Sequence, residues 1–288
     1  MKIISIAIAL ATVASAQQPS APFVTKQLAP SVYWVNGGGG NSGIIVGDKG
    51  VIVIDAKTTA DFGRQLLEEV AKVTSKPVTT VILTHSDGDH VNGLAAFPPG
   101  LTIIAQEMNK MEQETALKAG GRGAPPADRL PNKLITKMKE SEKIDGVNFE
   151  FYHWGPAHTS GDLIIYLPAQ KIVFTGDIIA TQRPDPIIHP EKNGSTEGWV
   201  NTTQGIIALN ASTYVPGHGD IQTRADIQAR LDATVAKRDK ILALIKEGKS
   251  LPEIKAAVGD PPPPSTPAGR GPAFGGLTDI VYAESTRK

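Results

Sequence analysis

The sequence predicts an α/β protein in which two β-sheets pack face to face and helices cover their outer surfaces. Three observations support this prediction. Apolar strand-like runs alternate with amphipathic helix-like segments over residues 32–105, which is typical of a layered α/β domain. A second block of strand-like runs at residues 147–175 also leads into helix-like segments. The two blocks form a loose duplication, and no repeat has the period of a solenoid.

Composition narrows the class of partner. The chain has 288 residues, which suits one large domain. It has 29 lysines and arginines and 29 aspartates and glutamates, so no basic excess indicates binding to nucleic acid or to an anionic membrane. We expect a small-molecule substrate and no nucleic-acid partner, and this expectation rests on the candidate site described below rather than on bulk charge. Because the chain has no cysteine, any metal ion must be bound through nitrogen and oxygen.

The N-terminus predicts export. Lys2 precedes a mostly apolar run at residues 3–14, and Ala14-Ser15-Ala16 has the pattern of a cleavage site, so residues 1–16 read as a signal peptide. The run is shorter than the roughly 18 apolar residues of a membrane anchor. We expect a periplasmic or secreted protein without a membrane anchor. The remaining divisions are an extended lead-in at residues 17–31, a main domain at 32–258 and a Pro/Gly-rich tail at 259–288.

Periodicity and turn residues place the elements. In the first block, strands are expected at residues 32–35, 43–46, 51–55, 78–83 and 101–105, and helices at 59–72, 91–97 and 106–119. In the second block, strands are expected at residues 147–154, 163–167, 172–175 and 213–215, and helices at 196–209, 224–247 and 251–258.

Three loops would shape a pocket, because loops set specificity on a fixed scaffold. They are residues 36–42, 120–126 and 182–198. The first contains four consecutive glycines and is either a plain loop or a mobile flap over a site. His189 lies in the third loop and is expected to be a surface histidine rather than a ligand. His153 is expected to be a packed or surface histidine.

A dense polar motif follows the strand expected at residues 78–83. It reads His85-Ser86-Asp87-Gly88-Asp89-His90. A strand end is a rigid platform for such side chains, and imidazole with carboxylate suits zinc, or iron or manganese. The alternative is an acidic turn that caps a helix.

The same residue types recur later in the chain. His158, Asp177 and His218 each follow an apolar strand-like run and lie beside or near glycine, which allows a sharp turn and close approach to a bound group. A single such residue is usually structural, but four such places in one chain indicate a shared site. Asp162, four residues after His158, is a candidate for supporting that histidine.

The combined pattern resembles the metallo-β-lactamase superfamily. The first signature of that family is His-x-His-x-Asp-His, followed by a histidine in a glycine-rich turn, a Gly-Asp after a strand and a Gly-His near the end. Residues 85–90, His158, Asp177 and His218 match these elements in order, and the resemblance covers about residues 32–220. It implies a four-layer αββα sandwich of the metallo-β-lactamase type. It does not specify the substrate, because the family hydrolyses β-lactams, lactones, thioesters and phosphoesters.

The resemblance also implies a ligand set. The first of two metal ions would be held by His85, Asp87 and His158; the second by Asp89, His90 and His218; and Asp177 would bridge them. Asp87 departs from the family, which has histidine there. A carboxylate is a harder ligand that favours iron or manganese over zinc, so one or two zinc ions, or iron or manganese, remain open. The bridging Asp177 is more similar to the glyoxalase II and lactonase branches than to the lactamases.

The function that these expectations support is an exported metal-dependent hydrolase. Metal-activated water would attack the carbonyl of a lactam, lactone, ester or thioester, and Asp89 would act as the catalytic residue that orients it. Two alternatives stay open: an iron-dependent oxidoreductase of the same fold, which Asp87 favours, and a metal-binding protein without turnover.

Overall fold

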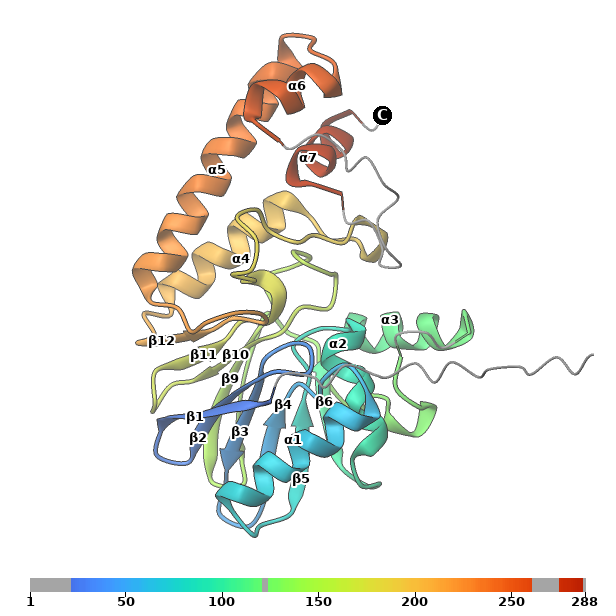
Figure 1. Cartoon of the computed structure of the whole chain (residues 1–288), viewed down its shortest axis with the longest axis vertical. Helices are drawn as coiled ribbons and strands as arrows, with labels where there is room; N and C mark the ends of the chain where they lie inside the picture. Colours follow the sequence, from blue (N-terminus) through green and yellow to red (C-terminus); the bar gives the residue numbers. More distant parts are fainter. Residues whose placement is uncertain (1–21, 121–123, 261–274, 287–288) are drawn as a thin grey trace, which may run out of the picture.

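The computed structural model describes residues 22–120, 124–260 and 275–286. They form the predicted four-layer αββα sandwich, with two sheets between layers of helices (Figure 1). The expected signal peptide at residues 1–16 lies outside the described residues, as do residues 17–21 of the lead-in, 121–123 of the second loop and 261–274 of the tail. Among the described helices, none is both long and apolar enough to cross a bilayer.

The first sheet has seven strands in the order of the chain. The strands are β1 Val24–Ala29, β2 Val32–Asn36, β3 Ser42–Val46, β4 Val51–Ile54, β5 Val78–Ile82, β6 Thr102–Gln106 and β7 Lys133–Ile135. Pairs from β1 to β4 are antiparallel, and pairs from β4 to β7 are parallel. β4 is fully buried because helices cover one of its faces and the second sheet covers the other, which explains its continuous apolar sequence.

The second sheet has five strands in the order β12-β11-β10-β9-β8. The strands are β8 Lys139–Ile144, β9 Val147–Tyr152, β10 Ile164–Leu167, β11 Ile172–Phe174 and β12 Thr213–Val215. β10 is antiparallel to both β9 and β11, and β12 is parallel to β11. The carboxyl ends of β9, β11 and β12 therefore meet at one edge of the sheet.

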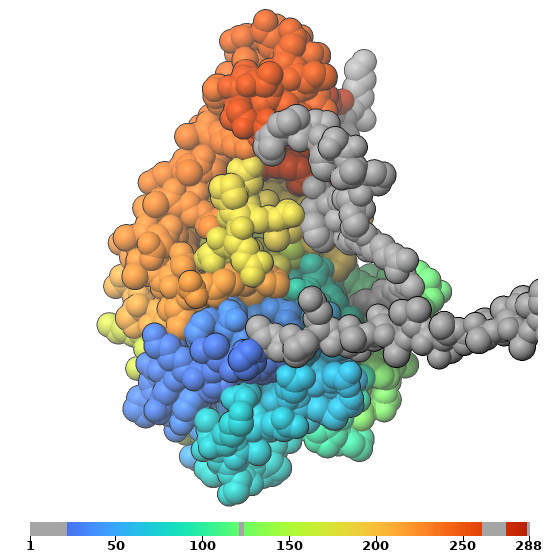
Figure 2. Space-filling model, viewed as in Figure 1, coloured from blue at the N-terminus to red at the C-terminus, as the bar shows by residue number. Residues whose placement is uncertain are grey.

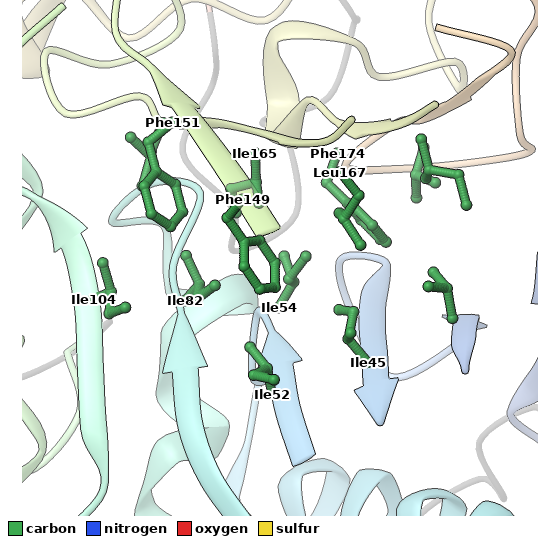
Figure 3. Packing of buried hydrophobic residues seen from close by; sticks show 14 of the residues in the cluster. Ile45, Ile52, Ile54, Ile82, Ile104, Phe149, Phe151, Ile165, Leu167 and Phe174 are labelled. Carbon is green, nitrogen blue, oxygen red and sulfur yellow. The ribbon is translucent and has the colours of Figure 1, made fainter. Parts of the chain in front are cut away.

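The main apolar core lies between the sheets (Figure 3). Ile52 and Ile54 of β4 point into this core, whereas Val51 and Val53 point to the helix side. Side chains alternate across a strand, so one short run serves both cores. Phe149 and the neighbouring phenylalanine on β9 supply the aromatic volume opposite these isoleucines.

Helices complete the outer layers. Their bounds are α1 Ala60–Val73, α2 Gly88–Val91, α3 Glu107–Lys118, α4 Thr196–Ala208, α5 Arg224–Lys246, α6 Leu251–Val258 and α7 Leu277–Thr286. α1, whose N-terminus is capped by Thr59 as expected, packs Leu66 against the first sheet. α4 packs Trp199 and α5 packs Ile227 against the second. α5 to α7 form one end of the molecule (Figure 2).

Three strands and the C-terminal helix were not predicted. β1 forms within the expected lead-in and pairs with β2. β7 and β8 are short or charged edge strands without a clear apolar alternation. α7 lies in the expected tail, where it packs against α5 and α6. Glu284 of α7 accepts hydrogen bonds from the backbone N–H of Thr196, at 2.9 Å, and from its hydroxyl, so α7 also contacts the start of α4.

The inter-sheet core predicts where stability resides. Phe149→Ala should lower the free energy of unfolding by about 3–5 kcal/mol, because it leaves a cavity among fully buried side chains. Met138→Ala is a control, because Met138 is 66% exposed and should change stability by no more than about 0.5 kcal/mol. Urea unfolding followed by circular dichroism measures both, and equal effects would contradict this account of the core.

Candidate metal centre

The seven predicted residues meet at one end of the sandwich. His85, Asp87, Asp89 and His90 follow β5 in the first sheet. His158 lies in the turn after β9, Asp177 in the 3₁₀ turn η3 (Gly176–Ile178) after β11, and His218 after β12. Because the carboxyl ends of these second-sheet strands share an edge, turns that are 60 residues apart in sequence (158 to 218) face the same point.

The side chains form two groups that could each hold a metal ion. The first contains His85, Asp87, His158 and Asp177, and the second contains Asp89, His90 and His218. Within each group the possible ligand atoms lie within 4.8 Å of one another. These are the same two sets that the family resemblance implies, with Asp177 placed in the first.

Spacings between ligand atoms fit a tetrahedral ion. Ligands about 2.0–2.1 Å from zinc lie about 3.3 Å from one another in a tetrahedron. The Nε2 atoms of His90 and His218 are 3.4 Å apart. His218 Nε2 is 3.0 Å from Asp89 Oδ2, and His158 Nε2 is 3.2 Å from Asp87 Oδ2. The nitrogen and oxygen atoms thus surround positions where a small cation fits.

Contacts outside the cluster orient three of the histidines. The Nδ1 atom of His85 contacts Thr84 Oγ1 at 2.9 Å, that of His90 contacts Asp55 Oδ2 at 2.8 Å, and that of His158 contacts the Ile187 carbonyl at 2.9 Å. Each Nε2 therefore points inward, which is how metal-binding histidines are usually held. Among the described residues, buried His85 Nε2 has no hydrogen-bond partner, as expected for an atom that binds a metal.

Asp177 lies between the two groups. Its Oδ1 is 3.2 Å from His90 Nε2, and its Oδ2 is 3.4 Å from His218 Nε2 and 4.0 Å from His158 Nε2. A carboxylate in this place can donate one oxygen to each of two ions. Gly217 makes room for it, since a Cβ atom there would lie 1.9 Å from Asp177 Oδ1.

In the metal-free cluster, protonated histidines lie beside ionised aspartates. Burial opposes the charged form of these histidines, but contacts with carboxylates outweigh it. The pKa of His218 is raised to about 9 by Asp177 and Asp89, and the pKa of His158 to about 9, chiefly by Asp87. Asp177 and Asp55 raise the pKa of His90 well above its usual value. Protons thus occupy the place that a divalent cation would take.

The carboxylates and His85 complete this picture. Burial raises the pKa of carboxyl groups, yet His90 and His218 hold the pKa of Asp177 well below its usual range and lower that of Asp89 to about 2. Burial and the neighbouring His90 and His158 keep the pKa of His85 well below its usual value. His85 is therefore a neutral imidazole, the form that binds metals.

Asp55 is a site residue that the sequence reasoning missed. It accepts hydrogen bonds from the Thr84 backbone N–H at 2.8 Å and the Thr84 hydroxyl at 2.7 Å, in addition to its contact with His90. It follows the apolar run of β4 directly. A charged residue just past a buried strand was the signal used for the other ligands, and it would have found Asp55 too.

Of the two forms expected for the glycine loop, a plain loop or a mobile flap, the contacts of residues 40 and 41 favour the plain loop. Gly40 and Asn41 are buried, and Asn41 Nδ2 donates to the carbonyls of Pro216 and Gly219 at 2.9 Å each. A Cβ atom at Gly40 would lie 2.2 Å from the His90 ring. The loop is therefore a fixed support that packs against a metal-site histidine, and glycine is required there by close approach.

His189 was expected at the surface, and that expectation is wrong. It is only 5% exposed, and its Nε2 lies 3.0 Å from Asp87 Oδ2. Its loop is one of the three expected to shape a pocket, but no strand end marks the histidine as part of the site. Lys192, three residues later, contacts Asp87 Oδ1 and was also missed.

Asp162 and His153 have supporting roles. Asp162 accepts hydrogen bonds from the N–H of Thr159 at 3.0 Å and from its hydroxyl at 2.8 Å, so it holds the turn that carries His158 rather than the His158 ring itself. His153 is half-buried and contacts the Asp162 carbonyl through Nδ1 at 2.8 Å, as a packed histidine would.

A cavity of about 330 Å³ opens onto the cluster. Its lining combines site residues with the loop at 180–189: Asp87, Asp89, Asp177, Ala180, Gln182, Arg183, Ile187, His189 and His218. A larger cavity of about 470 Å³ lies among α4, α5, α7 and residues 190–195. None of the seven predicted residues lines that larger cavity, so the chemistry belongs to the smaller one.

Comparison with known families agrees with this geometry. The family model described as the metallo-beta-lactamase superfamily matches residues 35–218, which include all seven residues. The chain belongs to the metallo-β-lactamase superfamily. Members of this superfamily are mostly hydrolases, and the two groups of histidine and aspartate supply its kind of metal site.

The superfamily members that are similar to this chain have names that describe different activities. The chain is 28% identical to 2,4-dinitroanisole O-demethylase subunit alpha from Nocardioides sp. (strain JS1661), over 74% of this chain and 63% of that protein. It is 23% identical to linear primary-alkylsulfatase from Pseudomonas sp. (strain ATCC 19151), over 76% and 50%. It is 24% identical to metallo-beta-lactamase type 2 from Bacillus cereus, over 64% and 68%. The chain thus matches between half and two thirds of the length of the first two relatives.

Solved structures show the same fold. The stereoselective inverting sec-alkylsulfatase Pisa1 from Pseudomonas sp. superposes with a TM-score of 0.70 at 22% identity, over 83% of this chain and 46% of that one. A metallo-beta-lactamase from Pontibacter korlensis superposes with a TM-score of 0.61 at 19% identity, over 74% and 98%.

The contact between Asp55 and His90 predicts a role in metal affinity. Asp55→Asn should weaken metal binding about 10–100-fold, because the carboxylate orients His90 and makes it a stronger base. Competition with a chromophoric chelator measures the affinity. The control is Asp145→Asn. The Asp145 carboxylate lies away from the site and accepts hydrogen bonds from the backbone N–H groups of Lys49 and Gly50. Equal affinities in wild type and Asp55→Asn would contradict the role.

The histidine pKa values predict how pH affects the metal-free protein. His158 and His218 have folded pKa values of about 9, above the roughly 6.5 of an unfolded histidine. The folded state therefore binds more protons, and its stability should fall as pH rises from about 6.5 to about 9. Burial lowers the pKa of Lys57 to about 7, so above that pH the folded state binds one proton fewer at Lys57 than the unfolded state does, which opposes the fall in stability. His90, whose pKa is raised on folding, adds to the fall.

Thermal melts across this pH range test the effect. The chelator-treated protein should lose stability with rising pH, and the metal-loaded protein should not, because a bound cation has already displaced the protons. His218→Asn should reduce the slope. A metal-free protein that gains stability between pH 6.5 and 9 would rule out this charge arrangement.

Proposed function

We propose that the protein is a zinc-dependent hydrolase that directs activated water at the carbonyl group of a lactam, lactone, ester or thioester. The observation that carries the proposal is the convergence of seven histidine and aspartate side chains into two adjoining groups with inward-pointing ligand atoms. A structural cluster without an ion would leave His85 Nε2 buried and without a hydrogen bond.

The residues divide by group. His85, Asp87 and His158 would hold one ion, Asp89, His90 and His218 a second, and Asp177 both. When bound, zinc lowers the pKa of a coordinated water to about 7, far below its value in bulk water, and so makes hydroxide available at neutral pH.

Asp89 is the carboxylate best placed to orient the attacking water. Its side chain is 33% exposed, against 15% for Asp87 and 5% for Asp177, so it is the carboxylate most accessible from the cavity. Its pKa of about 2 keeps it ionised at neutral pH. It can therefore accept a hydrogen bond from the attacking water and hold it in place.

The relatives support hydrolysis in general but do not specify which chemical bond this protein cleaves. Their names cover a β-lactam, an alkyl sulfate and the O-methyl group of 2,4-dinitroanisole. A substrate screen should therefore add sulfate esters and aryl ethers to the carbonyl compounds. The cavity presents Gln182 and Arg183 beside the apolar Ala180 and Ile187, a mixture that suits a partly apolar substrate with a polar group.

An iron-dependent oxidoreductase is the second candidate, and Asp87 is the observation that favours it. Asp87 lies within the first group, where its oxygen is a harder ligand than imidazole nitrogen. Metal analysis of protein purified without chelator separates the candidates. Zinc with hydrolytic turnover supports the first, and iron with oxygen uptake supports the second.

We also propose export, which rests on the signal-like pattern of residues 1–16. Sequencing the N-terminus of the mature protein tests it. A mature chain that starts at Gln17 is the expected result, and one that retains Lys2 would contradict it.

Substitution of the second group tests the hydrolase assignment. Asp89→Ala should lower the hydrolytic rate at least about 100-fold through loss of the carboxylate that positions the attacking water. His90→Ala should lower both the rate and the bound metal per chain. Asp232→Ala, on the exposed face of α5, should change neither. If Asp89→Ala and His90→Ala both keep the wild-type rate and metal content, the assignment is wrong.

A further inference from the structure

Asp87 has different partners on its two oxygens. Its Oδ2 faces the cluster, 3.2 Å from His158 Nε2 and 3.0 Å from His189 Nε2. Its Oδ1 contacts the ammonium group of Lys192 at 2.5 Å. One oxygen is therefore directed at the first group, and the other pairs with the Lys192 side chain.

We propose that Lys192 is the counter-charge that allows a carboxylate to serve at position 87, where the superfamily motif has a histidine. This inference rests on the proposed metal-dependent function, because it concerns the affinity of the first group for its ion. Lys192 acts as a positioning residue: it contacts the ligand rather than the reacting atoms.

Lys192 is anchored to the motif at a second point. Its Nζ donates to Ser86 Oγ at 2.9 Å, and Ser86 Oγ in turn donates to Glu112 of α3 at 2.5 Å. Glu112 also accepts a hydrogen bond from Ser160 Oγ at 2.6 Å. The ammonium group is thus held between two consecutive motif residues, and the side chain is only 26% exposed.

The backbone around Lys192 is built onto the turn that carries His158. Lys192 ends the 3₁₀ turn η4 (Pro190–Lys192), and its N–H donates to the His189 carbonyl at 2.9 Å. The His189 N–H donates to the His158 carbonyl at 2.9 Å, and the Ser195 N–H donates to the Ala157 carbonyl at 2.9 Å. A shift of the lysine would therefore disturb a metal-site histidine as well.

Charge explains why the pairing is needed. With aspartate at position 87, the first group contains two carboxylates, Asp87 and Asp177, and two imidazoles. With histidine there, it would contain one carboxylate and three imidazoles. Lys192 cancels the additional negative charge, so the Asp–Lys pair has the net charge of a neutral histidine. Without Asp87, the same ammonium group would be an unpaired cation that repels the metal ion.

The prediction is that positions 87 and 192 are coupled in metal binding. The test compares wild type, Asp87→His, Lys192→Met and the double variant by zinc stoichiometry and by chelator competition. Asp87→His alone should weaken the first zinc site at least tenfold. Adding Lys192→Met to it should recover at least tenfold. In the wild-type background Lys192→Met should not raise the zinc affinity, because it also removes the contact that positions Asp87. Lys133→Met, which breaks the β7–β8 ion pair with Glu142, is the matched control and should leave zinc affinity unchanged.

The outcomes separate this inference from the proposed function. A wild type that binds no zinc overturns both. A wild type with two zinc ions, in which Lys192→Met has the same effect in both backgrounds, overturns only the coupling. A single zinc that His218→Asn removes also overturns only the coupling, because the first group is then not a zinc site. If Asp87→His does not fold, as judged by circular dichroism, Asp87→Asn replaces it and must show the same coupling.

Discussion

The buried carboxylate of Asp55 is the interaction on which the rest of the site depends. It leaves the end of β4 with a φ of 56°, a left-handed conformation that non-glycine residues seldom adopt. There it binds Thr84, two residues past the end of β5, through two hydrogen bonds and His90 through a third. A buried negative charge is tolerable only with such partners. The sheet is therefore joined to the metal-site motif by a group that would be unstable without that motif.

The apolar framework could be predicted because its pattern is local. β4 is buried on both faces and its sequence is apolar throughout. The last three residues of β5 are also buried, and the motif follows shortly after them. Edge strands were harder to predict, because β8 carries charged residues at both its exposed and its partly buried positions. β7 and α7 are short and depend on neighbours that are distant in sequence.

Only those site residues that follow an apolar strand-like run could be predicted from the sequence. His85, His158, Asp177 and His218 follow apolar runs, and the structure brings them together. His189 and Lys192 lie in a loop that no apolar pattern frames, and their role comes from contact with Asp87 across about 100 residues of sequence. Glycine composition was likewise ambiguous: four glycines suggested mobility, but Gly40 is instead required by contact with His90. Glycine is favoured both in flexible loops and where the backbone packs closely against another group, so its presence in a sequence does not distinguish the two.

The contact between α7 and α4 has a practical consequence for anyone shortening this protein. Glu284 binds the first residue of α4, and α4 begins four residues after Lys192. Trimming the last dozen residues for crystallisation would remove the acceptor that holds this junction and uncover the apolar side chains of α5 beneath it. The C-terminal end should therefore be kept whole in expression designs, and purification tags are better placed elsewhere.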